Sequence, residues 1–593
     1  MIEPIDRHRA ACAVVRARVM AGTAGAPLEP RADDALLINH AACAVRAVRA
    51  HLGPLSAPTS SDALTATLDS IAEGYQAKPP IKTITLAGRI GRMLDPLWWS
   101  RNVRRELLRE NEAIEHAAGL VRRRGQCYVS DHAMKRKKER AAQNRRTLER
   151  LEVVNDEGQS FNLAEIADGS VSNPKLRRSE LMTRCRGFEE TAAYMGHEAV
   201  FLTLTCPSRF HRFNAKGKPN DKWNNATPRD GQKFLNETWA KIRAEWKREG
   251  HAPYGFRVAE PHHDGCPHWH ILLFAPSSGL GWFVPRRLAA GRDDAGAGIV
   301  GIAGRYACED SFNEAGAIKH RFTCERIDLS KGSATGYIAK YISKNIDGCT
   351  ELGDGIGLDF ASGQTASKAA PRVRTWASTW GIRQFQQIGG PSVTVWRELR
   401  RLGKDGQPLQ LELFEGPRAA ADRALWALFW VLQGGPEAPR TELIKPQYDK
   451  ETLGKYGDAV PRVVGVEAPT GEALTTRLHT WTVQRAGLAD LDAREDARRG
   501  LRDIAKRHPE LVKVLGLDAV TGDAVPVSEF ERSGKAAQPW TGVNNCTDAT
   551  DDAEAQALQD DFLRGRGGNH QRNPHENANF GRSDSGTVHH RRH

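Results

Sequence analysis

The chain has 593 residues and a formal net charge of +12 at pH 7, so it can hold several folded domains and its charge favours a polyanionic partner. Its ten cysteines form no CxxC pair, which argues against a zinc ribbon or a disulfide framework. The longest apolar run, residues 424–432, is far shorter than the roughly 20 residues of a membrane span, and the N-terminus lacks an apolar signal core. We therefore expect a cytoplasmic protein without a membrane partner.

The first 190 residues are dominated by helix-forming residues. Residues 1–90 are rich in alanine and predict a helical region of unknown role. Residues 91–190 predict a basic helical region, because residues 101–150 carry 15 Lys and Arg against 7 Asp and Glu. Clustered cations displace counterions from DNA phosphates, so a DNA contact is one interpretation of this region and a solvated helix face is the other.

Residues 191–402 mix strand and helix patterns and predict one domain of the α+β class. The order of elements favours a central antiparallel sheet with helices on one face. The predicted strands span residues 200–205, 254–260, 268–274 and 321–329, and the predicted helices span residues 227–250 and 333–345.

The last part of the chain is predicted to hold a mixed α/β region over residues 403–538. It includes a buried helix around Trp426, a hairpin within residues 462–483 and a charged helical stretch near residues 488–515. Residues 539–593 are polar and predict a disordered tail.

A candidate metal site lies on the hairpin predicted between residues 254 and 274. Residues two apart on a strand face the same way, so His268 and His270 share one face. The turn at Asp264-Gly265 folds the preceding strand back and brings Glu260 toward them. Two nitrogens and one carboxylate oxygen would leave coordination positions open, as a catalytic metal requires.

Other interpretations of this histidine-rich stretch stay open. A His-x-His pair alone is often a packed or surface pair, and His262 and His263 suit the turn better than the ligand set. A zinc hydrolase is also conceivable on ligand types, but zinc proteases carry two histidines on a helix as HExxH, which this chain lacks.

Two tyrosines stand one helical turn apart, at Tyr337 and Tyr341, with Lys340 and Lys344 beside them. A free phenol has a pKa near 10 and is a poor nucleophile at neutral pH, but a nearby cation or metal can activate it toward a phosphodiester. Attack would give a phosphotyrosine and a free 3′-hydroxyl. An amphipathic helix with tyrosines in the core is the alternative.

Three stretches in this order resemble motifs of the HUH superfamily of single-strand endonucleases: TLTCPSRFH, YGFRVAEPHHDGCPHWHILLF and ATGYIAKYISKN. More narrowly, the chain resembles the replication gene A protein family of tailed phages and prophages. Residues 173–189 and 372–402 share that resemblance, which covers about residues 95–402.

The resemblance implies a rolling-circle replication initiator that nicks one strand at a phage origin. It would stay on the 5′ end through a tyrosine while a host helicase and polymerase extend the 3′ end. His268 and His270 match the metal histidines, and Glu260 stands where related initiators carry a third, acidic ligand. Tyr337 and Tyr341 match the paired nucleophiles. Magnesium or manganese is the expected ion, although two imidazoles alone would favour softer ions.

Further contacts are predicted around these motifs. Lys340 is chosen for a phosphate or phenolate contact, and Lys344 and Arg383 for contacts with DNA. Trp376 and Trp380 are predicted to stack on unpaired bases, with core packing as the alternative.

Two other functions are alternatives to a replication initiator. A two-tyrosine HUH transposase would carry the same catalytic set, and a non-catalytic origin-binding protein would carry a decayed one. The complete set of five residues argues against decay. No Walker P-loop occurs in the sequence, so unwinding is expected from a partner protein.

Overall fold

The structure, a computed structural model, describes residues 28–485 apart from short segments of the chain. The segments left out of the description are residues 30–33, 53–60, 82–83, 290, 292–294, 312–315, 329–331, 350–358, 360–361, 403–410, 440 and 442. The charged helix predicted near residues 488–515 and the tail predicted over residues 539–593 lie outside the described residues.

The N-terminal helices share one apolar cluster in which Leu68 and Trp99 are fully buried. The helices are α2 (Asp34–Leu52), α3 (Ser61–Gly74), α4 (Leu86–Met93) and α5 (Pro96–Ala117). Helix α5 begins where the side chain of Asp95 accepts a hydrogen bond from the amide of Leu97, with Pro96 in the first turn.

A second long helix, α6 (Asp131–Glu149), is basic and solvent-exposed along nearly its whole length. Ser130 caps it, and Ala133 is its one buried residue. The chain then forms β1 (Leu151–Asn155), β2 (Ser160–Asn162) and α7 (Leu163–Asp168). Strand β1 is central in a three-stranded sheet, because the distant β13 (Trp481–Arg485) pairs with its other edge.

The central sheet has five antiparallel strands in the order β8-β3-β5-β4-β9. Its strands are β3 (Glu198–Thr205), β4 (Tyr254–Pro261), β5 (Pro267–Ala275), β8 (Phe322–Ile327) and β9 (Phe385–Ile388). The predicted α+β class with an antiparallel sheet is confirmed.

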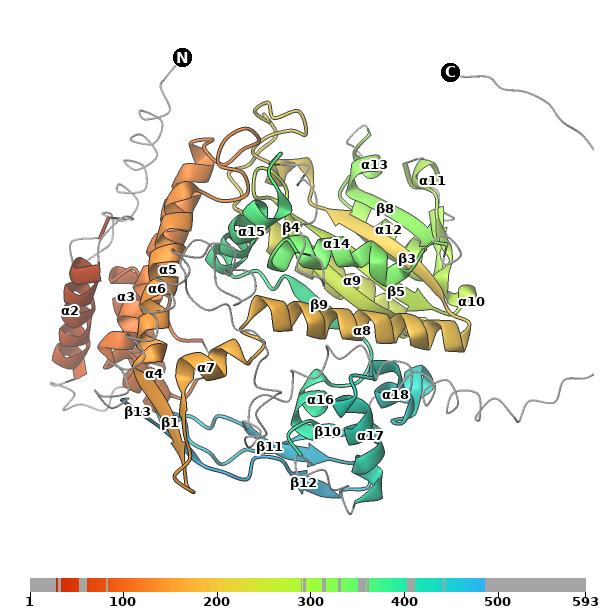
Figure 1. The fold of residues 1–593 in the computed structure, drawn as a ribbon. Helices are drawn as coiled ribbons and strands as arrows, with labels where there is room; N and C mark the ends of the chain where they lie inside the picture. Colours follow the sequence, from red (N-terminus) through yellow and green to blue (C-terminus); the bar gives the residue numbers. More distant parts are fainter. Residues whose placement is uncertain are drawn as a thin grey trace, which may run out of the picture. The chain divides into compact units, whose positions relative to one another are not determined.

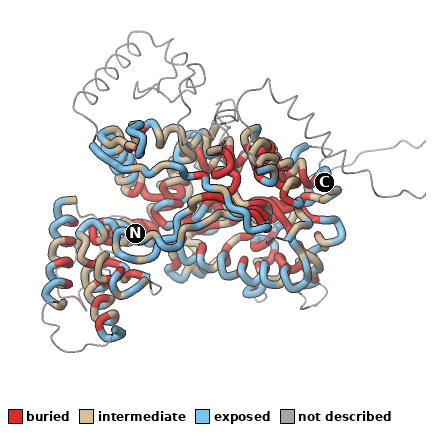
Figure 2. Tube along the Cα trace, turned by 90° about the horizontal axis from the view of Figure 1, so that it is seen from below, coloured by how far each residue is buried: buried red, intermediate tan, exposed pale blue. Residues whose placement is uncertain are grey.

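Helices cover both faces of this sheet, not the single face that the order of elements suggested (Figure 1). Helices α9 (Pro228–Arg248) and α12 (Gly298–Cys308) pack on one face, where Trp239 meets Trp269. Helices α8 (Pro174–Met195) and α14 (Ala334–Ile346) pack on the other. The reason lies in β5, whose residues are buried on both faces and therefore need cover on both. Figure 2 shows buried segments gathered in the middle of the molecule.

The remaining helices and strands flank this core. Helix α15 (Ala366–Trp380) leads into β9, and a C-terminal group packs against α8 through the buried Trp426. That group comprises α16 (Val393–Leu399), α17 (Glu412–Asp422), α18 (Trp426–Val431), β10 (Lys445–Asp449), β11 (Arg462–Glu467) and β12 (Ala473–Thr475). The short elements are η1 (Ser208–Phe210), α10 (Ser277–Leu280), β6 (Trp282–Phe283), α11 (Pro285–Ala289), β7 (Gly296–Ala297), α13 (Ala317–Arg321) and η3 (Gly435–Glu437).

Strands β11 and β12 form the hairpin predicted within residues 462–483. Among the described residues, no helix combines the length and the apolarity that crossing a bilayer requires.

Candidate active site

The hairpin of β4 and β5 sets the geometry of the site. Its register places Glu260 directly opposite His268. The turn needs Gly265, whose φ of +82° lies in the left-handed region. The fully buried carboxylate of Asp264 braces the turn by accepting a hydrogen bond of 3.1 Å from the amide of Cys266. The sequence therefore fixes the position of the carboxylate relative to the imidazole through one tight turn.

The structure brings the three predicted metal ligands together. One ligand atom each of Glu260, His268 and His270 lies within 4.8 Å of the other two. The distance from His270 Nε2 to Glu260 Oε2 is 3.8 Å, and the two imidazole centroids are 4.7 Å apart. We refer to these three residues as the triad.

The donor set fits a divalent cation. His268 Nδ1 is buried and has no hydrogen-bond partner among the described residues. Burial lowers the pKa of His270 to about 4, and burial together with His262 holds the pKa of His268 well below its usual value. Both imidazoles are therefore neutral near pH 7, the form in which they can bind a metal.

Thr203 on β3 is a member of the site that the sequence patterns did not single out. It stands opposite His270 in the sheet register, and its hydroxyl lies 3.2 Å from His270 Nδ1. This contact directs the other ring nitrogen toward Glu260. Thr203 lies within the stretch that resembles the first HUH motif, but the pairing of β3 with β5 could not be read from the sequence.

Glu260 is oriented by residues from the end of α14. Asn345 Nδ2 donates to Glu260, and Gln384 Nε2 donates to Asn345 Oδ1 at 3.2 Å. Lys344 Nζ lies 3.4 Å from Glu260 and 2.9 Å from the buried Asp359. The ammonium group of Lys344 is thus shared between these two carboxylates, and its contact with DNA stays a prediction.

Helix α14 carries both tyrosines over the face of the sheet that holds the triad. Ser333 caps the helix by accepting a hydrogen bond of 2.8 Å from the amide of Gly336. The ring of Tyr341 packs on His270 with centroids 4.2 Å apart, whereas Tyr337 lies one turn away, 6.4 Å from Tyr341. The triad and one phenol therefore meet in a single site.

The two phenols have different surroundings. Tyr337 donates a hydrogen bond of 2.6 Å to Glu325 on β8, and this contact, with burial, raises the pKa of Tyr337. Burial, followed by the charges of Glu260 and Glu325, raises the pKa of Tyr341 to about 12. Lys340 Nζ lies 4.9 Å from the Tyr341 ring and 5.5 Å from the Tyr337 ring, so one cation serves both phenols.

Helix α8 holds the tyrosine helix at both ends. The carboxylate of Glu189 accepts hydrogen bonds from the amides of Ala334 at 2.6 Å and Thr335 at 3.0 Å. Arg178 forms an ion pair with Asp347, the residue that ends α14. A carboxylate at a helix N-terminus also suits the helix dipole. Both contacts escaped prediction, because they join segments about 150 residues apart.

The two tryptophans predicted to stack on bases belong to the core, so that prediction is wrong. Trp376 is fully buried and its indole donates to the carbonyl of Gly265 at 2.8 Å. Trp380 is 3% exposed. Both lie on the face of α15 that packs into the main apolar cluster. The side chain of Arg383 is exposed, as a DNA contact would need to be.

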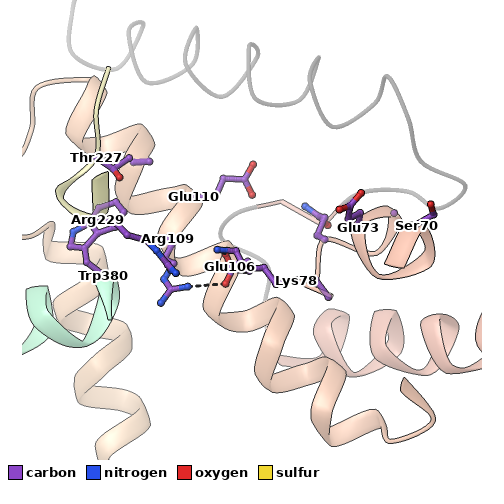
Figure 3. Close-up of a pocket in the computed structure, with 13 residues that line it drawn as sticks. Ser70, Glu73, Lys78, Glu106, Arg109, Glu110, Thr227, Arg229 and Trp380 are labelled. Carbon is purple, nitrogen blue, oxygen red and sulfur yellow. Dashed lines mark hydrogen bonds and ion pairs between the residues drawn. The ribbon is translucent and has the colours of Figure 1, made fainter. Parts of the chain in front are cut away.

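Trp380 also borders a cavity of about 700 Å³ that is separate from the triad and the tyrosines. Figure 3 shows its charged lining, which includes Glu106 and Arg109, joined by an ion pair of 2.9 Å, and Lys78. Because acidic and basic side chains alternate in its wall, the cavity offers no field of a single sign to an anionic ligand.

Comparisons with known proteins agree with the resemblance seen in the motifs. Residues 61–349 match the family model described as bacteriophage replication gene A protein (GPA). The chain is 39% identical over 416 residues to the replication gene A protein of Escherichia phage 186, an alignment that covers 68% of this chain and 57% of that protein. It is 38% identical over 431 residues to the probable replication protein P12 of Pseudoalteromonas phage PM2, covering 72% and 64%.

A third relative, from Salmonella paratyphi A, is named probable replication endonuclease from prophage-like region. It is 31% identical over 484 residues, covering 79% of this chain and 54% of that protein. The chain thus spans between about half and two thirds of the length of these curated relatives. No solved structure matches the chain. By this family match and these relatives, residues 61–349 of the chain belong to the bacteriophage replication gene A protein family.

Proposed function

We propose that the chain initiates rolling-circle DNA replication of a phage or prophage, as a site-specific endonuclease and strand transferase acting on single-stranded origin DNA in the host cytoplasm. Relatives whose names contain "replication gene A protein" and "replication endonuclease" support a role in DNA replication and cleavage. The observation that carries the proposal is the packing of Tyr341 on His270, with ring centroids 4.2 Å apart, beside the triad.

The proposed chemistry is a transesterification. The phenol oxygen of a tyrosine bonds to the phosphorus of the scissile phosphodiester, and the bond from phosphorus to the 3′-oxygen breaks. The phenol loses its proton and the 3′-oxygen gains one, so a 5′-phosphotyrosine and a free 3′-hydroxyl result. The phosphodiester energy is kept, so a second 3′-hydroxyl can reverse the step and join two ends.

The chain's own residues position the reacting groups. Glu260, His268 and His270 would hold a divalent ion, Mg²⁺ or Mn²⁺, which polarises the phosphodiester when bound. The ammonium of Lys340 lies within 5.5 Å of both phenol rings and would favour the developing negative charge on either one. A cation beside a phenol is needed here, because burial opposes ionisation of Tyr341.

DNA binding is proposed for exposed cations on two parts of the molecule. Helix α6 presents Lys135, Lys138 and Arg146 to solvent, and Arg383 is exposed after α15. These groups can neutralise phosphates without reading the base sequence. A host helicase and polymerase are the proposed protein partners, because extension of the freed 3′-hydroxyl requires strand separation and synthesis.

The test is a covalent adduct assay on an origin-bearing single strand with Mn²⁺. The protein should remain on the 5′ product, and a tryptic map of the adduct should place the nucleotide on the peptide of α14. The double variant Tyr337→Phe with Tyr341→Phe should form no adduct while keeping its DNA affinity within about twofold. Tyr194→Phe, which removes an exposed phenol on α8, is the matched control and should react normally.

Adduct formation by the double variant would disprove the assignment of the nucleophiles. Binding of the origin strand by the wild-type chain without any cleavage would favour a non-catalytic origin-binding protein instead.

A further inference from the structure

Strand β8 forms one edge of the central sheet and carries a carboxylate, Glu325, that accepts a hydrogen bond from Tyr337. Glu325 stands opposite Phe201 in the register of β8 and β3. Its exposed carboxylate accepts the hydrogen bond of Tyr337 at 2.6 Å. Among the described residues no cation forms an ion pair with Glu325, and the neighbouring Arg326 pairs with Glu198 at 3.1 Å. The carboxylate therefore keeps its capacity to accept a proton.

Phe201 separates this pair from the triad. Its ring lies 4.6 Å from the ring of Tyr337 and 5.5 Å from that of His270. Tyr341, by contrast, packs directly on His270, and the charge of Glu260 acts on it more strongly than that of Glu325. The two phenols, which are equivalent in the sequence pattern, thus differ in their contacts: Tyr337 donates a hydrogen bond to Glu325, whereas Tyr341 packs on the triad.

The short contact also restricts how Tyr337 can react. A phenolate 2.6 Å from a carboxylate would place two negative charges side by side, so Tyr337 stays protonated until it attacks. Its proton must then leave as the bond to phosphorus forms, and a group already within hydrogen-bond distance is placed to take it.

We propose that Glu325 is the proton acceptor for attack by Tyr337 and plays no such part for Tyr341. The inference rests on the proposed function. In the step, the phenol oxygen of Tyr337 bonds to phosphorus, its proton passes to a Glu325 carboxylate oxygen, and the 3′-oxygen leaves and takes a proton from water. Glu325 later returns its proton to solvent, so no oxidant or further reactant is needed.

The experiment compares two single-tyrosine proteins. In the Tyr341→Phe background only Tyr337 can attack, and in the Tyr337→Phe background only Tyr341 can. Glu325→Gln is introduced into each, because glutamine keeps the shape and accepts a hydrogen bond but cannot take the proton. Single-turnover adduct formation on an origin-bearing oligonucleotide is followed with Mn²⁺ at saturating protein.

Glu325→Gln should slow the adduct of Tyr337 by about 10²-fold, within the usual range for a lost general base, and change that of Tyr341 by less than about twofold. Glu198→Gln is the matched control: it removes another carboxylate of the same sheet, one that is half-buried, and should leave both rates unchanged.

Three results would overturn the assignment. Equal slowing in both backgrounds would mean that Glu325 supports the fold or the field of the whole site. Faster reaction of Tyr337 in the Glu325→Gln variant would mean that the hydrogen bond to Glu325 keeps this phenol unreactive. If the Tyr341→Phe protein forms no adduct even with Glu325 intact, Tyr337 does not attack DNA, and Glu325 has no attack to assist. Failure of the proposed function looks different, because the parent with both tyrosines would then form no adduct.

Discussion

The hydroxyl of Thr203 lies 3.2 Å from Nδ1 of His270 and so determines which nitrogen of that imidazole faces Glu260. Groups that orient a metal-binding histidine in this way commonly contribute 10–100-fold to metal affinity. We expect Thr203→Val to weaken Mn²⁺ binding by about tenfold, measured by calorimetry. Thr205→Val is the control, because its hydroxyl has no hydrogen-bond partner among the described residues. Unchanged affinity in Thr203→Val would remove the threonine from the site.

Glu189 offers a test of how α14 is held. Glu189→Ala leaves the amides of Ala334 and Thr335 without their acceptor, so the free energy of unfolding should fall by about 1 kcal/mol. Adduct formation should fall further than DNA binding, because the phenols lose their position while the basic surface remains. Glu190→Gln, which removes the carboxylate that pairs with Arg186 on the same helix, should change stability by less than about 0.5 kcal/mol.

If Glu189→Ala forms adduct at the normal rate, α8 does not position the tyrosine helix. Denaturant unfolding and the covalent assay on the same preparations separate these outcomes.

Removal of the metal ligands should separate binding from cleavage. His270→Ala removes one of the two imidazoles of the triad, so Mn²⁺ affinity and adduct yield should both fall by more than about 10²-fold. Affinity for the origin strand, measured by fluorescence anisotropy, should change little. Chelation of divalent ions should lower the adduct yield of the wild-type chain in the same way. Added Mn²⁺ should restore the yield of the wild type but not that of His270→Ala. Cleavage that survives chelation would exclude the triad as a metal site in the reaction.

The buried Glu112 is expected to make the free energy of unfolding decrease as pH rises. Its carboxylate is 1% exposed and accepts hydrogen bonds from the amide of Ser130 at 2.9 Å and from its hydroxyl at 2.5 Å. Burial raises its pKa from 4.5 to about 7, so the folded chain binds this proton more tightly than the unfolded chain does. The stabilisation is complete below pH 4.5 and is lost as pH rises through 7.

The free energy of unfolding of Glu112→Gln, relative to that of the wild type, should therefore increase by about 2–3 kcal/mol as pH rises from 5 to 8.5. Urea unfolding of both proteins at each pH measures the difference. A difference that stays constant across this range would contradict the raised pKa.

Local patterns in the sequence predicted much of the frame of the site. Alternation of β-branched residues predicted β3, and the Asp264-Gly265 turn predicted the hairpin that joins Glu260 to the histidines. The spacing of Tyr337 and Tyr341 placed both phenols on one helix face. These features depend on neighbours within about 15 residues, where strand period, turn chemistry and helix period are decisive.

The features that escaped prediction depend on pairings between distant segments. Thr203 meets His270 only because β3 pairs with β5 in the sheet. The ion pair of Lys344 with Glu260 likewise joins residues that are 84 positions apart. Trp376 and Trp380 carry the chemistry of a stacking platform, and only the packing of α15 shows that they fill the core instead.

The contacts around Glu260 also bear on synthesis of the protein. The hairpin supplies the triad by residue 270, but the partners that orient its carboxylate, Asn345 and Gln384, follow more than 70 and more than 110 residues later. A chain still on the ribosome with only the hairpin complete holds both histidines but neither Tyr337 nor Tyr341. If the proposed function holds, the unfinished chain would be inert, and cleavage of DNA would begin only once α14 and β9 have joined the sheet.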